Sequence, residues 1–261
     1  MKINKTKPLI IEACVTSVRS AVAAQEGGAL RVELCDNLYD GGTTPGPGSI
    51  LAARKHLHIG LNVIIRPRGG DFLYTDLEYG IMVKDLEFCR ENGADGVVFG
   101  ILDSKGRIDM KRNARLVELA GEMTTTFHRA FDVCQDPMEG LDDLIELGID
   151  RVLTSGHKPS AMEGVKLIER LVNYADDRII IMPGVGIDAT NIGDLIRQCK
   201  ASEYHVYQSS PVASGMEYQN PDVFMGTDPE LSEYHMELTD SRQFKAICEA
   251  ADRAWSNHFG K

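Results

Sequence analysis

Short apolar runs rich in β-branched residues alternate with longer amphipathic segments along nearly the whole chain. The first three such runs are LIIEACV (9–15), RVELC (31–35) and LNVIIRP (61–67), and each is followed by a segment whose apolar residues recur at helical spacing. About eight strand–helix pairs follow one another in this way, which is the number in a (β/α)8 barrel. The sequence therefore predicts an α/β fold, a single (β/α)8 TIM barrel spanning 1–261.

An open, doubly wound sheet is the main alternative for a chain that alternates strands with helices. Such a sheet has about six strands and carries a G-x-G-x-x-G turn after its first strand. That turn does not follow LIIEACV, and PGVGID (183–188) is only a fragment of it. No linker-like change of composition divides the 261 residues, so we expect one domain.

The charge of the chain limits the partners that it can have. There are 39 acidic and 28 basic residues, a net charge of −11, and no basic run that would neutralise nucleic-acid phosphates or anionic lipids. No run of about 18 apolar residues occurs, and the N-terminal MKINKTKPLIIEACV has a glutamate inside its apolar stretch, unlike a signal peptide. We therefore expect a cytoplasmic protein that binds neither nucleic acid nor membrane. Its six cysteines have no CxxC spacing and are expected to be free thiols.

Several predicted strands carry polar residues at positions that face the inside of a barrel. Alternate residues of a barrel strand point inward, while the others pack against the surrounding helices. In RVELC, Val32 and Leu34 suit the helix side, which leaves Glu33 and Cys35 inside. The same rule, applied to the other strands, predicts these inward side chains: Glu12, Cys14, Glu33, Cys35, Arg66, His128 and His205. This set is too polar for a core that only fills space.

Two carboxylates and an imidazole in this set have the chemistry of an acid–base site. We expect Glu12, Glu33 and His128 to be the catalytic groups, with His128 on a strand TTTFHRAF (124–131). A structural ion pair between Glu33 and Arg66 is the alternative. The loop RPRGGDFLYTD (66–76) adds arginines and glycines, which suit an anion held close to the backbone. The residues expected to contact such a ligand are Arg66, Arg68, Asp71, Ser155 and His205.

Cys14 and Cys35 lie on consecutive predicted strands, and such strands are usually neighbours about 4.8 Å apart. Two thiols at matching heights on adjacent strands can share a soft ion such as Cu(I), which prefers thiolate ligands. The alternative is that both cysteines are packing residues, because free cysteine is among the most buried residue types.

Long motifs in a fixed order resemble the CutC copper homeostasis family, among them EACVTSVRSAVAAQEGGALRVELCDNLYDGGTTP, VIIRPRGGDFLYTD, TFHRAFD and IIIMPG. The resemblance runs from about residue 9 to about residue 240. It implies a TIM barrel, a role in cytoplasmic copper tolerance, and copper binding at Cys14 and Cys35. Two positions depart from the family. Val185 stands where the family usually has glycine in an MPGGG turn, and the last strand is EYHVYQSS where relatives have small residues soon after the histidine.

Two functions are consistent with these features. The first is a cytoplasmic copper homeostasis protein that binds Cu(I) through Cys14 and Cys35. The second is a TIM-barrel enzyme, an isomerase, lyase or hydrolase, that performs acid–base chemistry on a small anionic substrate. The expected ligand is accordingly a copper ion or a small anion. The sequence does not set the oligomeric state, and a homo-oligomer is compatible with it.

Overall fold

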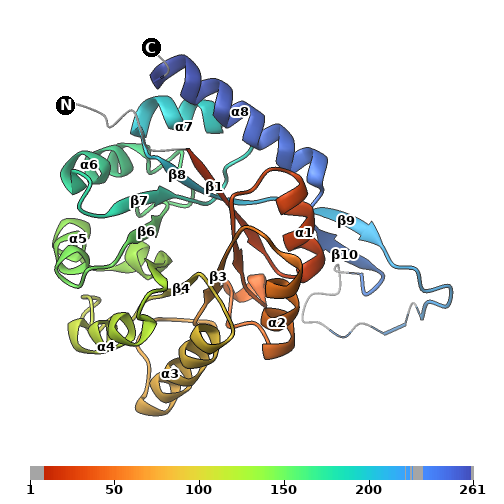
Figure 1. The fold of residues 1–261 in the computed structure, drawn as a ribbon, viewed down its shortest axis with the longest axis horizontal. Helices are drawn as coiled ribbons and strands as arrows, with labels where there is room; N and C mark the ends of the chain where they lie inside the picture. Colours follow the sequence, from red (N-terminus) through yellow and green to blue (C-terminus); the bar gives the residue numbers. More distant parts are fainter. Residues whose placement is uncertain (1–8, 221, 224, 226–231, 260–261) are drawn as a thin grey trace.

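The computed structural model describes residues 9–220, 222, 223, 225 and 232–259. Its centre is a cylinder of eight parallel strands in the order β7-β6-β5-β4-β3-β2-β1-β8 (Figure 1). The cylinder closes where β7 meets β8, in a parallel bridge between Gly184 and His205. The predicted TIM barrel is confirmed. The barrel strands are β1 (Ile10–Val15), β2 (Arg31–Leu34), β3 (Gly60–Ile64), β4 (Gly96–Phe99), β5 (Thr124–Phe127), β6 (Arg151–Thr154), β7 (Ile180–Pro183) and β8 (Glu203–Tyr207).

Helices surround the barrel and connect its successive strands (Figure 1). Their first turns follow the rules for capping. Ser17 accepts a hydrogen bond from the backbone N–H of Ser20 at the start of α1, and a reciprocal capping box of Thr75 and Glu78 starts α3. The helices are α1 (Val18–Glu26), α2 (Pro47–His56), α3 (Asp76–Glu91), α4 (Met110–Ala120), α5 (Pro137–Glu146), α6 (Val165–Ala175), α7 (Ile192–Cys199) and α8 (Ser241–Phe259), with short 3-10 turns η1 (Leu38–Asp40) and η2 (Arg129–Val133).

The main apolar core lies between the strands and the helices. Val32 and Leu34 of β2 are buried in it, as the alternation of β2 predicts, and so is Phe127 of β5. Burial of one such side chain contributes about 1.5–3 kcal/mol, so this layer dominates the stability of the fold. The inside of the barrel is consequently free to hold polar groups.

β5 is shorter than the sequence predicted. The strand ends at Phe127, and the chain turns at once into η2, with His128 as the residue that caps this 3-10 turn. The prediction of a strand over 124–131 is therefore wrong at its C-terminal end. The tight turn has a consequence for the site, because it places Arg129 and Asp132 at the mouth of the barrel.

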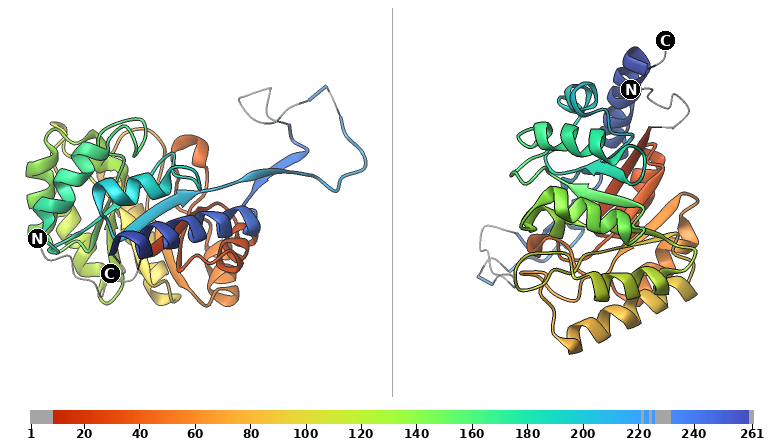
Figure 2. Two further views of the ribbon diagram at one scale, coloured as in Figure 1. Left: turned by 90° about the horizontal axis from the view of Figure 1, so that it is seen from above. Right: turned by 90° about the vertical axis from the view of Figure 1, so that its left-hand side faces the viewer.

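The chain leaves the barrel after β8 and forms an antiparallel arm. The arm consists of β9 (Ser210–Ala213) and β10 (His235–Leu238), which pair only with each other among the described strands. Figure 2 shows the arm extending away from the barrel beyond the surrounding helices. The chain then returns to the barrel as α8.

Within the described ranges, no helix is both long and apolar enough to cross a membrane. The first eight residues, on which the argument against a signal peptide partly rests, lie outside the described residues.

Candidate functional site

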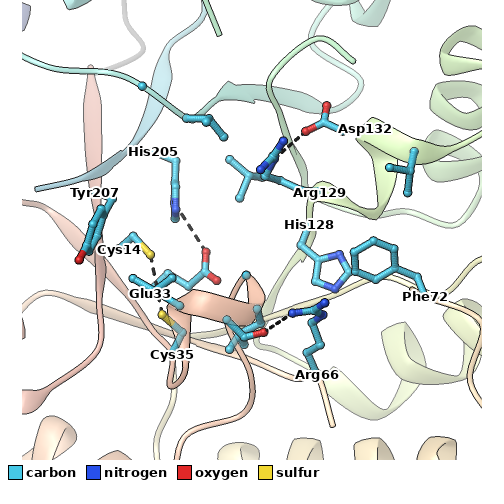
Figure 3. Close-up of a pocket in the computed structure, with 18 residues that line it drawn as sticks. Cys14, Glu33, Cys35, Arg66, Phe72, His128, Arg129, Asp132, His205 and Tyr207 are labelled. Carbon is cyan, nitrogen blue, oxygen red and sulfur yellow. Dashed lines mark hydrogen bonds and ion pairs between the residues drawn. The ribbon is translucent and has the colours of Figure 1, made fainter. Parts of the chain in front are cut away.

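A cavity of about 590 Å³ opens at the C-terminal ends of the barrel strands. Its two sides carry different chemistry, and Figure 3 shows them facing each other across the opening. We call one side the thiol wall, formed by Cys14, Glu33, Cys35, His205 and Tyr207. We call the other the imidazole wall, formed by Arg66, Phe72 and His128.

The two thiols of the thiol wall lie in contact. The Sγ atoms of Cys14 and Cys35 are 3.8 Å apart, and Cys35 Sγ also donates to the backbone oxygen of Val15. The residues are not level in the sheet, since Cys14 is opposite Glu33 in the pairing of β1 with β2. The hydrogen bond with Cys35, together with burial, raises the pKa of the Cys14 thiol well above its ordinary value. Both cysteines are therefore buried thiols whose sulfur atoms border the cavity.

Beneath the cavity lies a buried set of charges, here called the charge network. Arg31 donates to carboxylate oxygens of both Glu12 and Glu203, and Arg151 Nε donates to Glu203 Oε2 at 3.1 Å. His205 Nδ1 donates to Glu12 Oε1 at 2.7 Å. Burial by itself raises the pKa of Glu12, but the charge of Arg31 and the hydrogen bond from His205 outweigh it and hold that pKa below its usual range. Glu12 is thus an ionised anchor that does not border the cavity.

Glu33 stands between the charge network and the cavity. Its Oε2 atom is 3.6 Å from His205 Nδ1 and has no hydrogen-bond partner. Burial raises the pKa of Glu33 to about 8, against the opposing charge of His205. Burial lowers the pKa of His205, but its hydrogen bond with Glu12 and the charge of Glu33 raise it above its ordinary value overall. Glu33 is therefore a carboxyl group that can change its protonation state near neutral pH.

His128 is held in one tautomer by the backbone of η2. Its Nδ1 atom accepts a hydrogen bond from the N–H of Ala130 at 3.2 Å, so the ring proton is on Nε2. Nε2 has no partner, and burial lowers the pKa of the ring to about 3. Gly100 makes room for this ring, since a Cβ atom there would lie 2.6 Å from His128 Nδ1. His128 is consequently a neutral hydrogen-bond donor rather than a base.

Arg66 does not pair with Glu33, so the structural ion pair that was the alternative for these two residues is not formed. Its Nη1 atom donates to the backbone oxygens of Asp40 and Gly42 at 2.6 and 2.7 Å, and its Nη2 atom donates to that of Gly70 at 2.8 Å. Loop carbonyls thereby hold the guanidinium against the ring of Phe72, with 5.2 Å between Arg66 Cζ and the ring centroid. Only Nε is left without a partner.

Three of the predicted ligand-contacting residues lie outside the cavity lining. Arg68 turns toward α3, where its Nε atom donates to Glu78 at 2.5 Å, and it also pairs with Asp71. Ser155 is buried and donates to the backbone oxygen of Lys158 at 2.5 Å. Arg129 and Asp132, which are paired with each other at 2.8 Å, border the cavity from η2 instead.

Glu12, Glu33 and His205 resemble a metal-binding group, because each offers one ligand atom and these atoms all lie within 4.8 Å of one another. Arg31, however, already compensates the charge of Glu12. A divalent cation bound to Glu12 would lie close to that guanidinium, and the two positive charges would repel each other. The three residues are therefore better described as part of the charge network and its contact with Glu33.

Val185 borders the cavity in a left-handed conformation, with φ of +79°. Such a backbone costs a β-branched residue about 1–3 kcal/mol, whereas glycine adopts it freely. We therefore expect Val185→Gly to raise the free energy of unfolding by about 1 kcal/mol, measured by urea denaturation. Val185→Ala keeps a Cβ atom and is the matched control. An equal gain from both variants would contradict this account.

Comparison with known proteins adds independent information. The CutC family model matches residues 9–210. A protein of Chromobacterium violaceum named as a family protein CutC is 47% identical over 245 residues, which cover 94% of this chain and 99% of that protein. A human protein named copper homeostasis protein cutC homolog is 43% identical over 246 residues, which cover 94% of this chain and 90% of the human one. The crystal structure of CutC from Streptococcus agalactiae matches with a TM-score of 0.72 and 37% identity, over 76% of this chain and 97% of that chain.

Proposed function

Because this chain belongs to the CutC family, we propose that it acts in copper homeostasis and binds Cu(I) between the Sγ atoms of Cys14 and Cys35. The family name supplies the connection to copper. The thiol wall supplies ligands of the kind that Cu(I) prefers, since soft thiolates select it over hard cations.

The observation that carries this proposal is the 3.8 Å separation of the two sulfur atoms at the edge of an open cavity. A metal–thiolate bond is about 2.3 Å long, so one ion can bridge two sulfur atoms that are up to about 4.6 Å apart. The required movement of the sulfur atoms is small. Although Cys14 and Cys35 are only 6% and 1% exposed, an ion can reach them through the cavity that they line.

Protonation opposes binding at this site. The thiols must lose their protons to act as ligands, and the raised pKa of Cys14 makes that loss costly. Cu(I) offsets this cost by bonding to both sulfur atoms in place of their protons. Binding under these conditions releases protons, so Cu(I) affinity grows as the pH rises.

We expect Cys14→Ser and Cys35→Ser each to weaken Cu(I) binding by about 100-fold or more, because a hydroxyl group is a poor ligand for a soft ion. The measurement is a competition titration against a Cu(I) chelator of known affinity, under reducing conditions. Cys248→Ser, in α8, is the matched control and is expected to bind as the unmodified protein does. Unchanged affinity in the Cys14→Ser, Cys35→Ser double variant would exclude this site.

A further inference from the structure

Three buried polar atoms without a hydrogen-bond partner belong to residues that line the same cavity. They are Glu33 Oε2, Arg66 Nε and His128 Nε2, and they make up three of the five such side-chain atoms among the described residues. A buried polar atom without a partner is costly, and native proteins rarely keep several of them together. Their collection around one opening indicates a ligand that satisfies them. The copper proposal uses none of these atoms.

The imidazole wall offers two hydrogen-bond donors to this ligand. His128 donates from Nε2 because Ala130 fixes the tautomer, and Arg66 donates from Nε because backbone oxygens take up its other nitrogens. Phe72 lies against both side chains, with its ring 4.9 Å from that of His128 and 5.2 Å from Arg66 Cζ. Two fixed donors beside an apolar ring suit one acceptor oxygen.

That oxygen is better assigned to a carbonyl than to a phosphate. Nε is the only nitrogen of Arg66 without a partner, and the other guanidinium at the cavity, that of Arg129, is paired with Asp132. Arg68 is directed away from the cavity. A phosphate would need more donors than this wall provides.

Glu33 faces the imidazole wall across the opening (Figure 3). On the side of Glu33 away from the opening lie His205 and Glu12. Glu33 Oε2 is 3.6 Å from His205 Nδ1, and His205 Nδ1 is 2.7 Å from Glu12 Oε1, so the charges of both residues act on Glu33. A carboxyl group opposite a pair of fixed donors is the arrangement for moving a proton next to a carbonyl group. The cavity volume of about 590 Å³ is that of a site for a small molecule.

We propose that the cavity binds a small hydroxylated carbonyl compound whose carbonyl oxygen accepts hydrogen bonds from His128 Nε2 and Arg66 Nε, and that Glu33 transfers a proton at the adjacent carbon. The C–H bond breaks, and its proton goes to the Glu33 carboxylate. The electron pair forms a carbon–carbon double bond, and the carbonyl oxygen takes up the negative charge. The two donors stabilise that charge. Return of the proton to the same carbon regenerates the compound. Its delivery to the former carbonyl carbon gives an isomer, once the proton of the adjacent hydroxyl group has moved to the former carbonyl oxygen. Nothing is oxidised or reduced.

The test measures solvent deuterium entering dihydroxyacetone and D-glyceraldehyde in D2O, by NMR, with metal-free protein in the presence of a chelator. We expect exchange clearly faster than in buffer, and a loss of about 100-fold in Glu33→Gln and again in His128→Ala. Glu33→Asp should recover part of the rate. The exposed His56, in the last turn of α2, gives the matched control His56→Ala, which should exchange as the unmodified protein does.

Exchange at the buffer rate with both compounds would overturn the proposal. A rate that Glu33→Gln leaves unchanged would do the same, and so would one unaffected by His128→Ala. The chelator keeps this test separate from the copper proposal. If no exchange is measured, the copper proposal is unaffected. If Cu(I) does not bind, the exchange proposal is unaffected.

Discussion

Arg31→Met is expected to lower the free energy of unfolding by about 3–5 kcal/mol, because it leaves the carboxylates of Glu12 and Glu203 buried without their shared cation. The side chain of Glu12 has no exposed surface, so water cannot replace the lost guanidinium. Removing one partner from a buried ion-pair network costs far more free energy than the intact network contributes to stability. Urea denaturation monitored by circular dichroism measures this difference.

The control is an arginine in an exposed ion pair. Arg115 pairs with Glu118 at 2.6 Å, with both side chains more than half exposed, and such a pair contributes about 0–1 kcal/mol. Arg115→Met should therefore change the stability little. If Arg31→Met were equally mild, the charge network would not be a structural element of the barrel.

Glu33→Gln is expected to stabilise the protein at alkaline pH, by about 4 kcal/mol at pH 8. The pKa of Glu33 is about 8 in the folded protein against an ordinary value of 4.5, so the folded state binds more protons than the unfolded state between these values. Stability then falls as the pH rises across this interval, by up to about 1.4 kcal/mol per pH unit. Glutamine carries no charge and removes this dependence.

Thermal and urea unfolding between pH 5 and pH 9 would measure the effect. The unmodified protein should lose stability toward pH 8, whereas Glu33→Gln should show a flatter profile, with the two converging toward pH 4.5. The exposed Glu118 provides the control Glu118→Gln, which should leave the slope unchanged. Parallel profiles for Glu33→Gln and the unmodified protein would mean that Glu33 is ionised in the folded state at neutral pH. A stabilising variant at this position would also indicate that the carboxyl group is kept for a function and not for the fold.

The barrel and the inward position of its polar residues could be predicted because strand alternation and helix covering are local consequences of the sequence. Glu12, Glu33 and His205 were found in this way, and they are among the buried groups of the barrel interior. The contact between Cys14 and Cys35 was also predicted, although from matching heights that the strand register does not have.

Three members of the charge network were missed although the same rule applies to them. Arg31, Arg151 and Glu203 are the first residues of β2, β6 and β8, each an even number of positions before a residue on the inner face of its strand. Extending the alternation to the first residue of each strand would have included them.

The roles of the loop arginines could not be predicted from pattern. Whether Arg66 meets a carboxylate or a ring of carbonyl oxygens depends on how the segment around η1 folds back over β3, and no local periodicity encodes that path. Arg68 is turned away by Glu78, which belongs to the capping box of α3. The early end of β5 could not be predicted for the same reason, since the 3-10 turn η2 replaces the expected strand over residues 129–131.

A closed barrel has no free edge, yet its seams differ in strength. β1 shares five paired positions with β8 and four with β2, whereas β7 and β8 are held by the bridge between Gly184 and His205. Local unfolding begins where few hydrogen bonds must break, so thermal breathing of this barrel would start at the β7–β8 seam. Each such opening would draw Glu203 of β8 away from Arg151 of β6, while His205 stays beside Glu12 on β1, and would let water reach a carboxylate that is otherwise buried. The flexibility of one strand pair would in this way set how often the interior exchanges protons with the solvent.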